Sequence, residues 1–231
     1  MSTRLVIIGT GGNAYDVLDI VEAQNRIAQT WDILGFLDDT KPAGSDHLQF
    51  PILGALADAG KMPADCLFIN AIGSDKSYRR RPAIIKTTGL APERFGTLIH
   101  PLAAISSRAI IGRGVSVGAG VSIAGNVTIA DHVAISQGVI IGHDSVVEAY
   151  SMLAPRAVLS GFTSIGRACY IGAGAMLRQH VQVGEGALIG MGAVVLHSVH
   201  PGLVVVGNPA RILCKDDAPL GHRAASESLA I

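Results

Sequence analysis

The sequence lacks the features that would point to nucleic acid, a membrane or a metal. Lysine plus arginine and aspartate plus glutamate each number 18, so no charge excess favours an anionic partner such as nucleic acid or a membrane surface. No apolar run approaches the ~20 residues of a membrane span, and the apolar run near the start is too short for a signal peptide. The three cysteines have unrelated spacings, which fit neither a metal motif nor a disulfide framework: Cys66, Cys169 and Cys214. We therefore expect a soluble protein of the reducing cytoplasm.

Aromatic residues are also scarce, at 4%, whereas glycine is abundant, with 28 residues. This composition predicts many tight turns around a core of small aliphatic side chains. In residues 1–98, short β-rich runs at 4–9, 33–39 and 67–73 alternate with helical patterns, the clearest of which is 13–29. Strand and helix in alternation predict a small parallel sheet, that is, a Rossmann-like α/β domain.

From Ile99 onward every sixth residue is a large aliphatic one, without insertion, as far as Val195. A second series, from Ala103 to Val199, contains only small or β-branched residues. Helices repeat at 3.6 residues and amphipathic strands at 2.0, whereas a parallel β-helix can repeat at six, with three units to a turn. Residues 99–213 are therefore predicted to form a parallel β-helix with the large aliphatic residues inside. Residues 214–231 are predicted to be a poorly ordered tail.

This repeat resembles that of the hexapeptide-repeat acyltransferases, whose repeat forms a left-handed β-helix. The closing "VVVGNPARIL" is similar to that family's exit from the helix, and "IIGTGGNA", "LGFLDD", "NAIGSD" and "LIHP" are similar to the NeuD/PglD-type sugar acetyltransferases. The resemblance implies acetyl transfer from acetyl-CoA to a nucleotide-linked amino sugar of the 4-amino-4,6-dideoxy type, for surface glycan biosynthesis. It also implies a homotrimer with active sites between subunits. The sequence gives no evidence for a metal.

His143 is the candidate catalytic base. Counted from Ile141, it occupies an outward or corner position of its repeat, and residues 18 apart stack in successive coils. Its neighbours in that stack, Gly125 and Gly161, leave room for a ligand, and Asp144 follows it directly. The resemblance implies the same pair, because related enzymes carry a catalytic histidine followed by an acidic residue here. A solvated surface histidine is the alternative. No carboxylate directly follows the other outward histidines: His132, His180 and His197.

Acetyl transfer explains why this pair is needed. The acceptor must lose a proton while it attacks the thioester, and an imidazole, whose ordinary pKa is ~6.5, can accept that proton near neutral pH. A carboxylate that accepts the other ring N–H fixes the tautomer and stabilises the imidazolium. Asp144 is the first candidate for this partner and Glu148 is the second. One departure from the family is that some relatives carry a second histidine nine residues after the first, where this sequence has Met152.

Acetyl-CoA, by resemblance, would lie along the outer β-helix against a neighbouring subunit. Carried over by position, its contacts would be made largely through backbone, at Gly161, Ala173, Gly190 and Met191. The alternative is that these residues are turn glycines and ordinary members of the repeat.

The front domain carries a phosphate-binding pattern between its first strand and first helix. Gly9, Gly11, Gly12 and Ala14 match G-x-G-x-x-G/A, which places phosphate at a helix N-terminus. A dinucleotide fold uses two βαβαβ halves, and this domain has room for about one, so we expect a nucleotide-linked sugar instead. The resemblance adds further contacts to this ligand, at Asp38, Asp39, Gly73 and Ser74, although a solvated turn is the alternative for the aspartates. The run Arg79, Arg80 and Arg81 could face phosphates, but we interpret it as a solvated helix face.

Two other functions stay open at this point. O-acetylation of a sugar hydroxyl, as in sialic-acid-type enzymes, could use the same base. A non-catalytic scaffold that recognises nucleotide sugars would bind them without turnover of any acyl-CoA. The sequence does not identify the nucleotide base, the sugar or the acyl chain length.

Overall fold

The structure, a computed structural model, describes residues 2–215. The predicted tail lies outside the described residues from 216 onward. The front domain contains a five-stranded sheet with the order β3-β4-β2-β1-β5. Its parallel strands are β1 (Thr3–Ile8), β2 (Trp31–Leu37), β4 (Phe50–Gly54) and β5 (Leu67–Asn70), and the edge strand β3 (Asp46–His47) is antiparallel to β4.

Helices cover both faces of this sheet. The helix α1 (Asn13–Ile27) packs against one face, while η1 (Leu56–Lys61) and α2 (Arg81–Thr87) pack against the other. Two further single turns are η2 (Tyr78–Arg80) and η3 (Pro92–Arg94). The three strands and the first helix predicted from the sequence are confirmed, whereas β3, β4 and η1 lie in a stretch to which the sequence pattern assigned no element.

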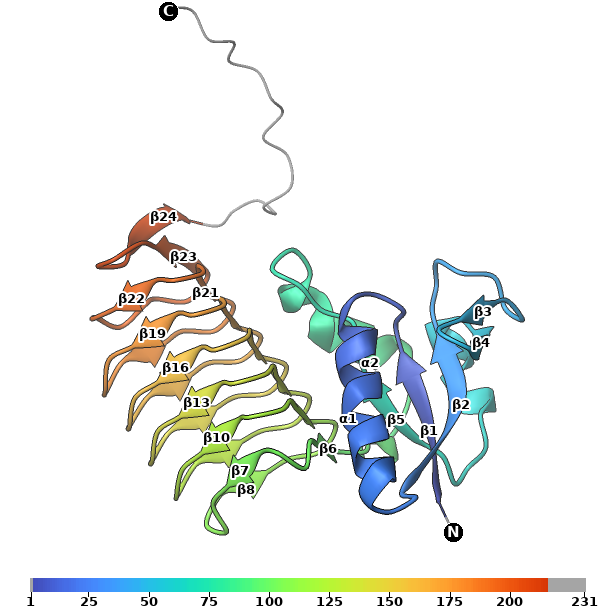
Figure 1. Cartoon of the computed structure of the whole chain (residues 1–231). Coiled ribbons are helices and arrows are strands. Elements are labelled where there is room, and N and C mark those ends of the chain that lie inside the picture. Colours follow the sequence, from blue (N-terminus) through green and yellow to red (C-terminus); the bar gives the residue numbers. More distant parts are fainter. Residues whose placement is uncertain (1, 216–231) are drawn as a thin grey trace, which may run out of the picture.

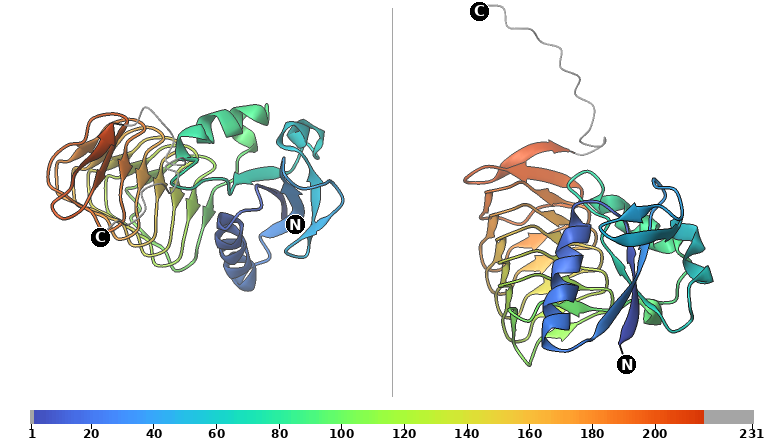
Figure 2. Two further views of the ribbon diagram at one scale, coloured as in Figure 1. Left: turned by 90° about the horizontal axis from the view of Figure 1, so that it is seen from above. Right: turned by 45° about the vertical axis from the view of Figure 1, so that its right-hand side comes forward.

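The rest of the described chain coils into a prism with three flat sides (Figure 1, Figure 2). Its sides are parallel sheets, each built from strands 18 residues apart. Sheet I contains β6 (Leu98–Ile99), β9 (Ser116–Val117), β12 (Ala134–Ile135), β15 (Met152–Leu153), β18 (Tyr170–Ile171), β21 (Leu188–Ile189), β23 (Leu203–Val206) and the antiparallel β24 (Arg211–Lys215). Sheet II contains β7 (Ala104–Ile105), β10 (Ser122–Ile123), β13 (Ile140–Ile141), β16 (Val158–Leu159), β19 (Met176–Leu177) and β22 (Val194–Val195). Sheet III contains β8 (Ile110–Ile111), β11 (Thr128–Ile129), β14 (Val146–Val147), β17 (Ser164–Ile165) and β20 (Gln182–Val183).

The period of six predicted these strands residue by residue. Each large aliphatic residue from Ile99 to Val195 is the second residue of a strand, and the series fills the interior together with its small partners, such as Val139 and Cys169. Burial raises the pKa of the Cys169 thiol to about 11, so this cysteine is a packing residue and not a nucleophile. The fold class predicted from the sequence is confirmed.

The corners of the prism have one backbone conformation in common. Three residues after each large aliphatic one, from Gly114 to Gly192, φ is positive, whether the residue is glycine or not. Asp144, with φ 57°, occupies this left-handed position at the corner between sheets II and III. Asparagine and aspartate tolerate that conformation better than most side chains. The catalytic candidate His143 therefore precedes a fixed turn.

The front domain rests on sheet I and reaches both of its corners (Figure 2). Apolar side chains of both parts form one cluster there: Tyr78, Met152, Leu188 and Val204. At one corner, Gln137 Nε2 donates to Asp16 Oδ1 over 2.7 Å. At the other, Arg81 donates to carbonyls of the β-helix. Because sheet I is covered, the corner between sheets II and III is the one opposite the front domain.

Candidate active site

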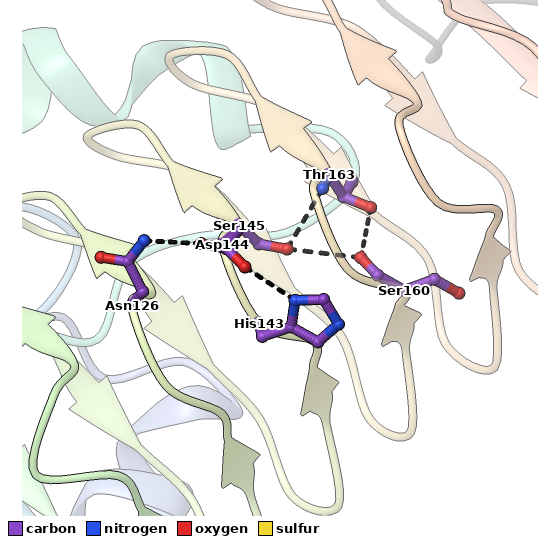
Figure 3. Close-up of polar contacts among 6 residues, drawn as sticks. All are labelled: Asn126, His143, Asp144, Ser145, Ser160 and Thr163. Atoms are coloured by element: carbon purple, nitrogen blue, oxygen red, sulfur yellow. Dashed lines mark hydrogen bonds and ion pairs between the residues drawn. The ribbon is translucent and has the colours of Figure 1, made fainter.

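His143 lies at that opposite corner, after β13 and before β14, and points outward from the coil (Figure 3). Its Nδ1 lies 2.8 Å from Asp144 Oδ2. Asn126, 18 residues earlier and therefore one coil away, donates from Nδ2 to Asp144 Oδ1 at 2.6 Å. The imidazole is thus oriented by a chain of hydrogen bonds while its side chain stays 62% exposed.

The carboxylate of Asp144 is held in its charged form. The hydrogen bond from Asn126, and after it the one with His143, lowers the pKa of Asp144. An ionised carboxylate can only accept hydrogen bonds, so Nδ1 of His143 carries the proton and Nε2 keeps a lone pair. Nε2 is therefore the atom that can accept a proton from a substrate. No hydrogen bond within the described residues joins the second candidate, Glu148, to this histidine.

Buried hydroxyl groups brace the corner from inside (Figure 3). Ser145 Oγ accepts from the backbone N–H of Thr163, and both side chains donate to the carbonyl of Ser160, over 3.3 Å and 2.6 Å. Ser145 and Thr163 are buried. The turn that carries His143 is therefore tied to the equivalent turn of the next coil.

Gly161 lies against the imidazole ring. A Cβ built on Gly161 would lie 2.9 Å from Cε1 and from Nε2 of His143, so the ring fills the space of a side chain there. On the other side, a Cβ on Gly125 would meet only Ser106 Oγ, at 3.6 Å. An exposed phenylalanine, Phe162, contacts the ring edge-on, with centroids 5.1 Å apart. Gly161 and the ring of Phe162 therefore border the imidazole.

The seven residues predicted to bind the nucleotide sugar line one cavity of about 540 Å³ in the front domain: Gly9, Gly11, Gly12, Asp38, Asp39, Gly73 and Ser74. They come from the loops after β1, β2 and β5, at the carboxyl edge of the parallel sheet. Asn13 Nδ2, at the start of α1, donates to the carbonyl of Gly73 over 2.8 Å and joins two of these loops. A cavity of this size and position suits a small ligand.

Asp38 holds the cavity loops together. Its Oδ2 accepts hydrogen bonds from the backbone N–H and hydroxyl of Thr10, and its Oδ1 accepts the same pair from Thr40. Burial alone would raise the pKa of Asp38, but these hydrogen bonds from Thr40 and Thr10 outweigh it and the pKa is lowered. Asp39 accepts from the backbone N–H of Leu56 at 2.9 Å. Both aspartates line the cavity, Asp38 as a buried residue and Asp39 as an exposed one.

The interpretation of the arginine run as a solvated helix face is wrong for Arg79 and Arg81, whereas Arg80 is exposed. Arg81 is 1% exposed and donates to the carbonyls of Ile72, His132 and Tyr150. Arg79 donates to the carbonyls of Gly186 and Gly202 on the β-helix, and Arg80 lines the cavity. The three arginine side chains point in different directions because Arg79 and Arg80 end the 3-10 turn η2 and Arg81 begins α2. This junction lies between the two domains.

The four residues predicted to contact acetyl-CoA do not lie together. Gly161 lies at the corner of His143, whereas Ala173, Gly190 and Met191 follow strands of sheet I and lie at the corner between sheets I and II. Both corners border sheet II. Met191 is 81% exposed, and Gly190 has a packing role, because a Cβ there would lie 2.6 Å from Val206 Cγ1.

The front domain covers two residues on the outside of the coil, His132 and Met152. His132 points out of its coil, but the front domain buries it between the rings of Tyr150, stacked at 5.0 Å, and Phe95, edge-on at 4.6 Å. Met152, at the position where some relatives have a second histidine, is buried in sheet I, and its Sδ lies 2.4 Å from a Cβ built on Gly73. The period of six gives the direction of a side chain from the coil, but not what covers it.

From β13 to β22 the outer surface of sheet II is apolar, whereas the outward residue of β10 is the exposed Ser122. Ile140 and Met176 are 47% and 54% exposed, and Val158 and Val194 beside them are half-buried. The equivalent outward positions of sheet III are mixed: Thr128, Ser164 and Gln182 are polar, whereas Val146 and the 66% exposed Ile110 are apolar. Exposed apolar stripes of this kind are typical of interaction sites and ligand-binding grooves. It lies beside His143, on the side of the prism away from the front domain (Figure 1).

Within residues 2–215, no helix is long and apolar enough to cross a membrane. The same residues contain no group of three or more His, Cys, Asp or Glu side chains that could hold a metal ion.

Comparison with known families gives two matches. The PglD N-terminal domain matches residues 4–83, and the bacterial transferase hexapeptide family, with six repeats, matches residues 162–197. A curated relative, the UDP-N-acetylbacillosamine N-acetyltransferase of Bacillus subtilis (strain 168), is 30% identical over 114 residues. That match covers 48% of this chain and 49% of the relative, so it spans about half the length of each.

Solved structures resemble almost the whole chain. The acetyltransferase domain of PglB from Neisseria gonorrhoeae FA1090, in complex with acetyl coenzyme A, has 31% identity and a TM-score of 0.78, over 92% of this chain and 100% of that chain. PerB from Caulobacter crescentus, in complex with CoA and GDP-perosamine, has 27% identity and a TM-score of 0.75, over 90% and 96%. The Caulobacter enzyme has also been solved with one histidine replaced by asparagine or by alanine.

Proposed function

Because the chain belongs to the PglD-type sugar acetyltransferases with a hexapeptide-repeat left-handed β-helix, we propose that it transfers an acetyl group from acetyl-CoA to the amine of a nucleotide-linked amino sugar. The observation that carries this proposal is the pair of His143 and Asp144, which presents a free Nε2 beside Gly161 on an exposed corner. The cavity in the front domain supplies a place for the nucleotide.

In the proposed reaction His143 is the general base. The amine nitrogen attacks the carbonyl carbon of the thioester while Nε2 accepts the amine proton. Asp144 accepts the Nδ1–H throughout and stabilises the imidazolium that forms. Collapse of the tetrahedral intermediate breaks the carbon–sulfur bond, and the departing thiolate takes the proton from the imidazolium. This direct transfer needs no acyl-enzyme, and the buried Cys169 takes no part.

The complexes of two relatives support the choice of substrates. One relative binds acetyl coenzyme A and the other binds CoA and GDP-perosamine. We place the acceptor in the same class, a 4-amino-4,6-dideoxy sugar on a nucleoside diphosphate, used for surface glycans. Gly9, Gly11, Gly12, Gly73 and Ser74 would surround it, with the aspartates behind them. This arrangement has one base and one cavity, and no step in it uses a metal.

The position of the two parts supports an active site shared between copies of the chain. Within one chain the cavity belongs to the domain that covers sheet I, whereas His143 occupies the opposite corner of the prism. A second copy packed on the apolar surface of sheet II would lie beside His143 and could bring its own cavity there. Acetyl-CoA would lie in the same groove, between Gly161 on one border of sheet II and Ala173, Gly190 and Met191 on the other. We therefore propose a homotrimer.

A thiol-release assay tests the proposed function. Purified protein, acetyl-CoA and a panel of UDP-, GDP- and dTDP-linked amino sugars should release CoA only with an amine acceptor. The matched control is each sugar with a hydroxyl in place of the amine. Turnover confined to the hydroxyl sugars would replace the proposal with O-acetylation. Binding of nucleotide sugars without turnover of any acyl-CoA would leave a binding scaffold.

A further inference from the structure

The cavity in the front domain has carboxylates at one end, and they are already engaged. Asp38 accepts four hydrogen bonds from Thr10 and Thr40, and Asp39 accepts one from the backbone N–H of Leu56. These groups carry negative charge and brace loops, so they cannot be what attracts a phosphate. A cation elsewhere on the lining would attract an anionic ligand to this cavity.

Two glycines of the cavity are not required by the fold. A Cβ on Gly9 would lie 2.3 Å from Ile72 Cγ1, and its φ of 95° also demands glycine. A Cβ on Gly11 or on Gly12 would meet nothing within 4 Å, and neither residue has a positive φ. Glycine at these positions therefore keeps open a space that no protein atom fills, directly before the N-terminus of α1, where backbone N–H groups favour an anion.

Arg80 is the cation on the lining of this cavity. Its neighbours in sequence are both fixed, because Arg79 donates to Gly186 and Gly202 on the β-helix and Arg81 donates to three buried carbonyls. The backbone of Arg80 is thus held from both sides. Among the described residues, no hydrogen bond or ion pair joins the Arg80 guanidinium to another group, although it lines the cavity with Ser74 and Ser77.

We infer that Arg80 binds the diphosphate of the nucleotide sugar, opposite Gly11 and Gly12. This inference rests on the proposed function for the class of ligand. A guanidinium presents a planar fork that matches two phosphate oxygens, and the open glycines allow the diphosphate to approach the backbone closely. The base and ribose then lie toward Asp38 and Asp39, and the sugar leaves the cavity past Gly73 and Ser74.

Calorimetric titration with UDP, GDP and dTDP, and with the matching nucleosides, tests this inference on the full chain. Arg80→Gln should weaken binding of the preferred diphosphate by about 10- to 100-fold, and should leave binding of its nucleoside unchanged. Arg80→Lys keeps the positive charge but loses the planar guanidinium. Its affinity for the diphosphate should lie between those of wild type and Arg80→Gln. The control is Lys76→Gln, an exposed cation of the same segment that does not line the cavity.

The outcomes separate this inference from the proposed function. Equal diphosphate affinity in wild type and Arg80→Gln would overturn the inference, even if the protein acetylates amino sugars. A loss of diphosphate binding in Arg80→Gln alone would support it, even if no acetyl transfer were found. If Lys76→Gln lost as much diphosphate affinity as Arg80→Gln, the inference would also be overturned, because the effect would then come from the net charge of the protein and not from Arg80.

Discussion

At the scale of single residues, the proposed chemistry depends on His143, whose two ring nitrogens have different surroundings. Asp144 occupies one nitrogen and leaves the other toward the surface, and Asn126 fixes the carboxylate in turn. This histidine could be chosen from the sequence by its outward position, its glycine neighbours in the stack and the acidic residue after it. The aromatic contact from Phe162 could not be foreseen, because it depends on where a corner residue of the next coil points.

Gly161 offers a test of how tightly the imidazole must be placed. In Gly161→Ala the new methyl group would lie within 2.9 Å of the ring, so the ring must turn away from its present position. We expect kcat to fall by at least about 10-fold, with little change in thermal stability, because a misplaced general base loses much of its effect. Gly125→Ala, which makes only an ordinary contact in the same stack, is the control. Unchanged kcat in Gly161→Ala would show that the ring position matters little.

His132 predicts a pH dependence of stability. Burial, aided by the positive charges of Arg81 and Arg167, lowers its pKa from 6.5 to about 4. Between about pH 6.5 and pH 4, residue 132 is therefore protonated in the unfolded chain but not in the folded chain. The free energy of unfolding falls as the pH drops through this range.

In His132→Phe, the free energy of unfolding should decrease less steeply as the pH drops. The side chain fits, because Phe162 has the same left-handed corner conformation, with φ 59° at both positions. Calorimetric melting temperatures between pH 7 and pH 4.5 would measure the effect, as roughly 1.4 kcal/mol per unit of pKa difference. His180→Phe, at an exposed corner, should keep the wild-type slope. Parallel slopes in wild type and His132→Phe would contradict this account.

At the scale of elements, the period of six determines the β-helix almost completely. A coil with three flat sides needs one large side chain inside each strand, and the series from Ile99 to Val195 supplies it without a gap. The sequence therefore predicted every strand of sheets II and III. It did not predict the contact between the domains, because no local pattern shows that Met152 or His132 is covered by a distant segment.

Arg81 is the central residue of the contact between the front domain and the β-helix. Its guanidinium is buried, no carboxylate of the described residues pairs with it, and it donates instead to the carbonyls of Ile72, His132 and Tyr150. We expect Arg81→Met to lower the free energy of unfolding by about 2–5 kcal/mol, because three buried carbonyls lose their donor. Chemical denaturation would measure this, with Arg80→Met as the neighbouring control. Equal stabilities of the two variants would mean that water replaces the lost donor.

At the scale of the whole molecule, the proposed site would be complete only in an assembly of several copies of the chain. The cavity and His143 lie on opposite sides of one chain, and the apolar surface of sheet II lies beside the histidine. The sequence resemblance implied a homotrimer. The outward residues of the strands, taken from the sequence alone, did not show which side of the prism would contact the neighbouring copy.

Assembly can be tested through Met176, which is exposed at the middle of that apolar surface. Met176→Glu should convert a trimer into smaller species and abolish turnover, because a buried unpaired charge opposes association. Light scattering coupled to size exclusion would give the mass. Ile110→Glu, on the exposed face of sheet III, should leave the trimer intact. A trimer that persists in Met176→Glu would place the contact on another surface.

The role of His143 as general base is tested most directly by the initial rate of thiol release by His143→Ala, with acetyl-CoA and a nucleotide-linked amino sugar. The account predicts a loss of about 10²–10⁴-fold relative to wild type, because the general base is removed. His180→Ala, a neighbouring histidine without a carboxylate partner among the described residues, should keep the wild-type rate. A wild-type rate in His143→Ala would contradict the account and show that the base lies elsewhere.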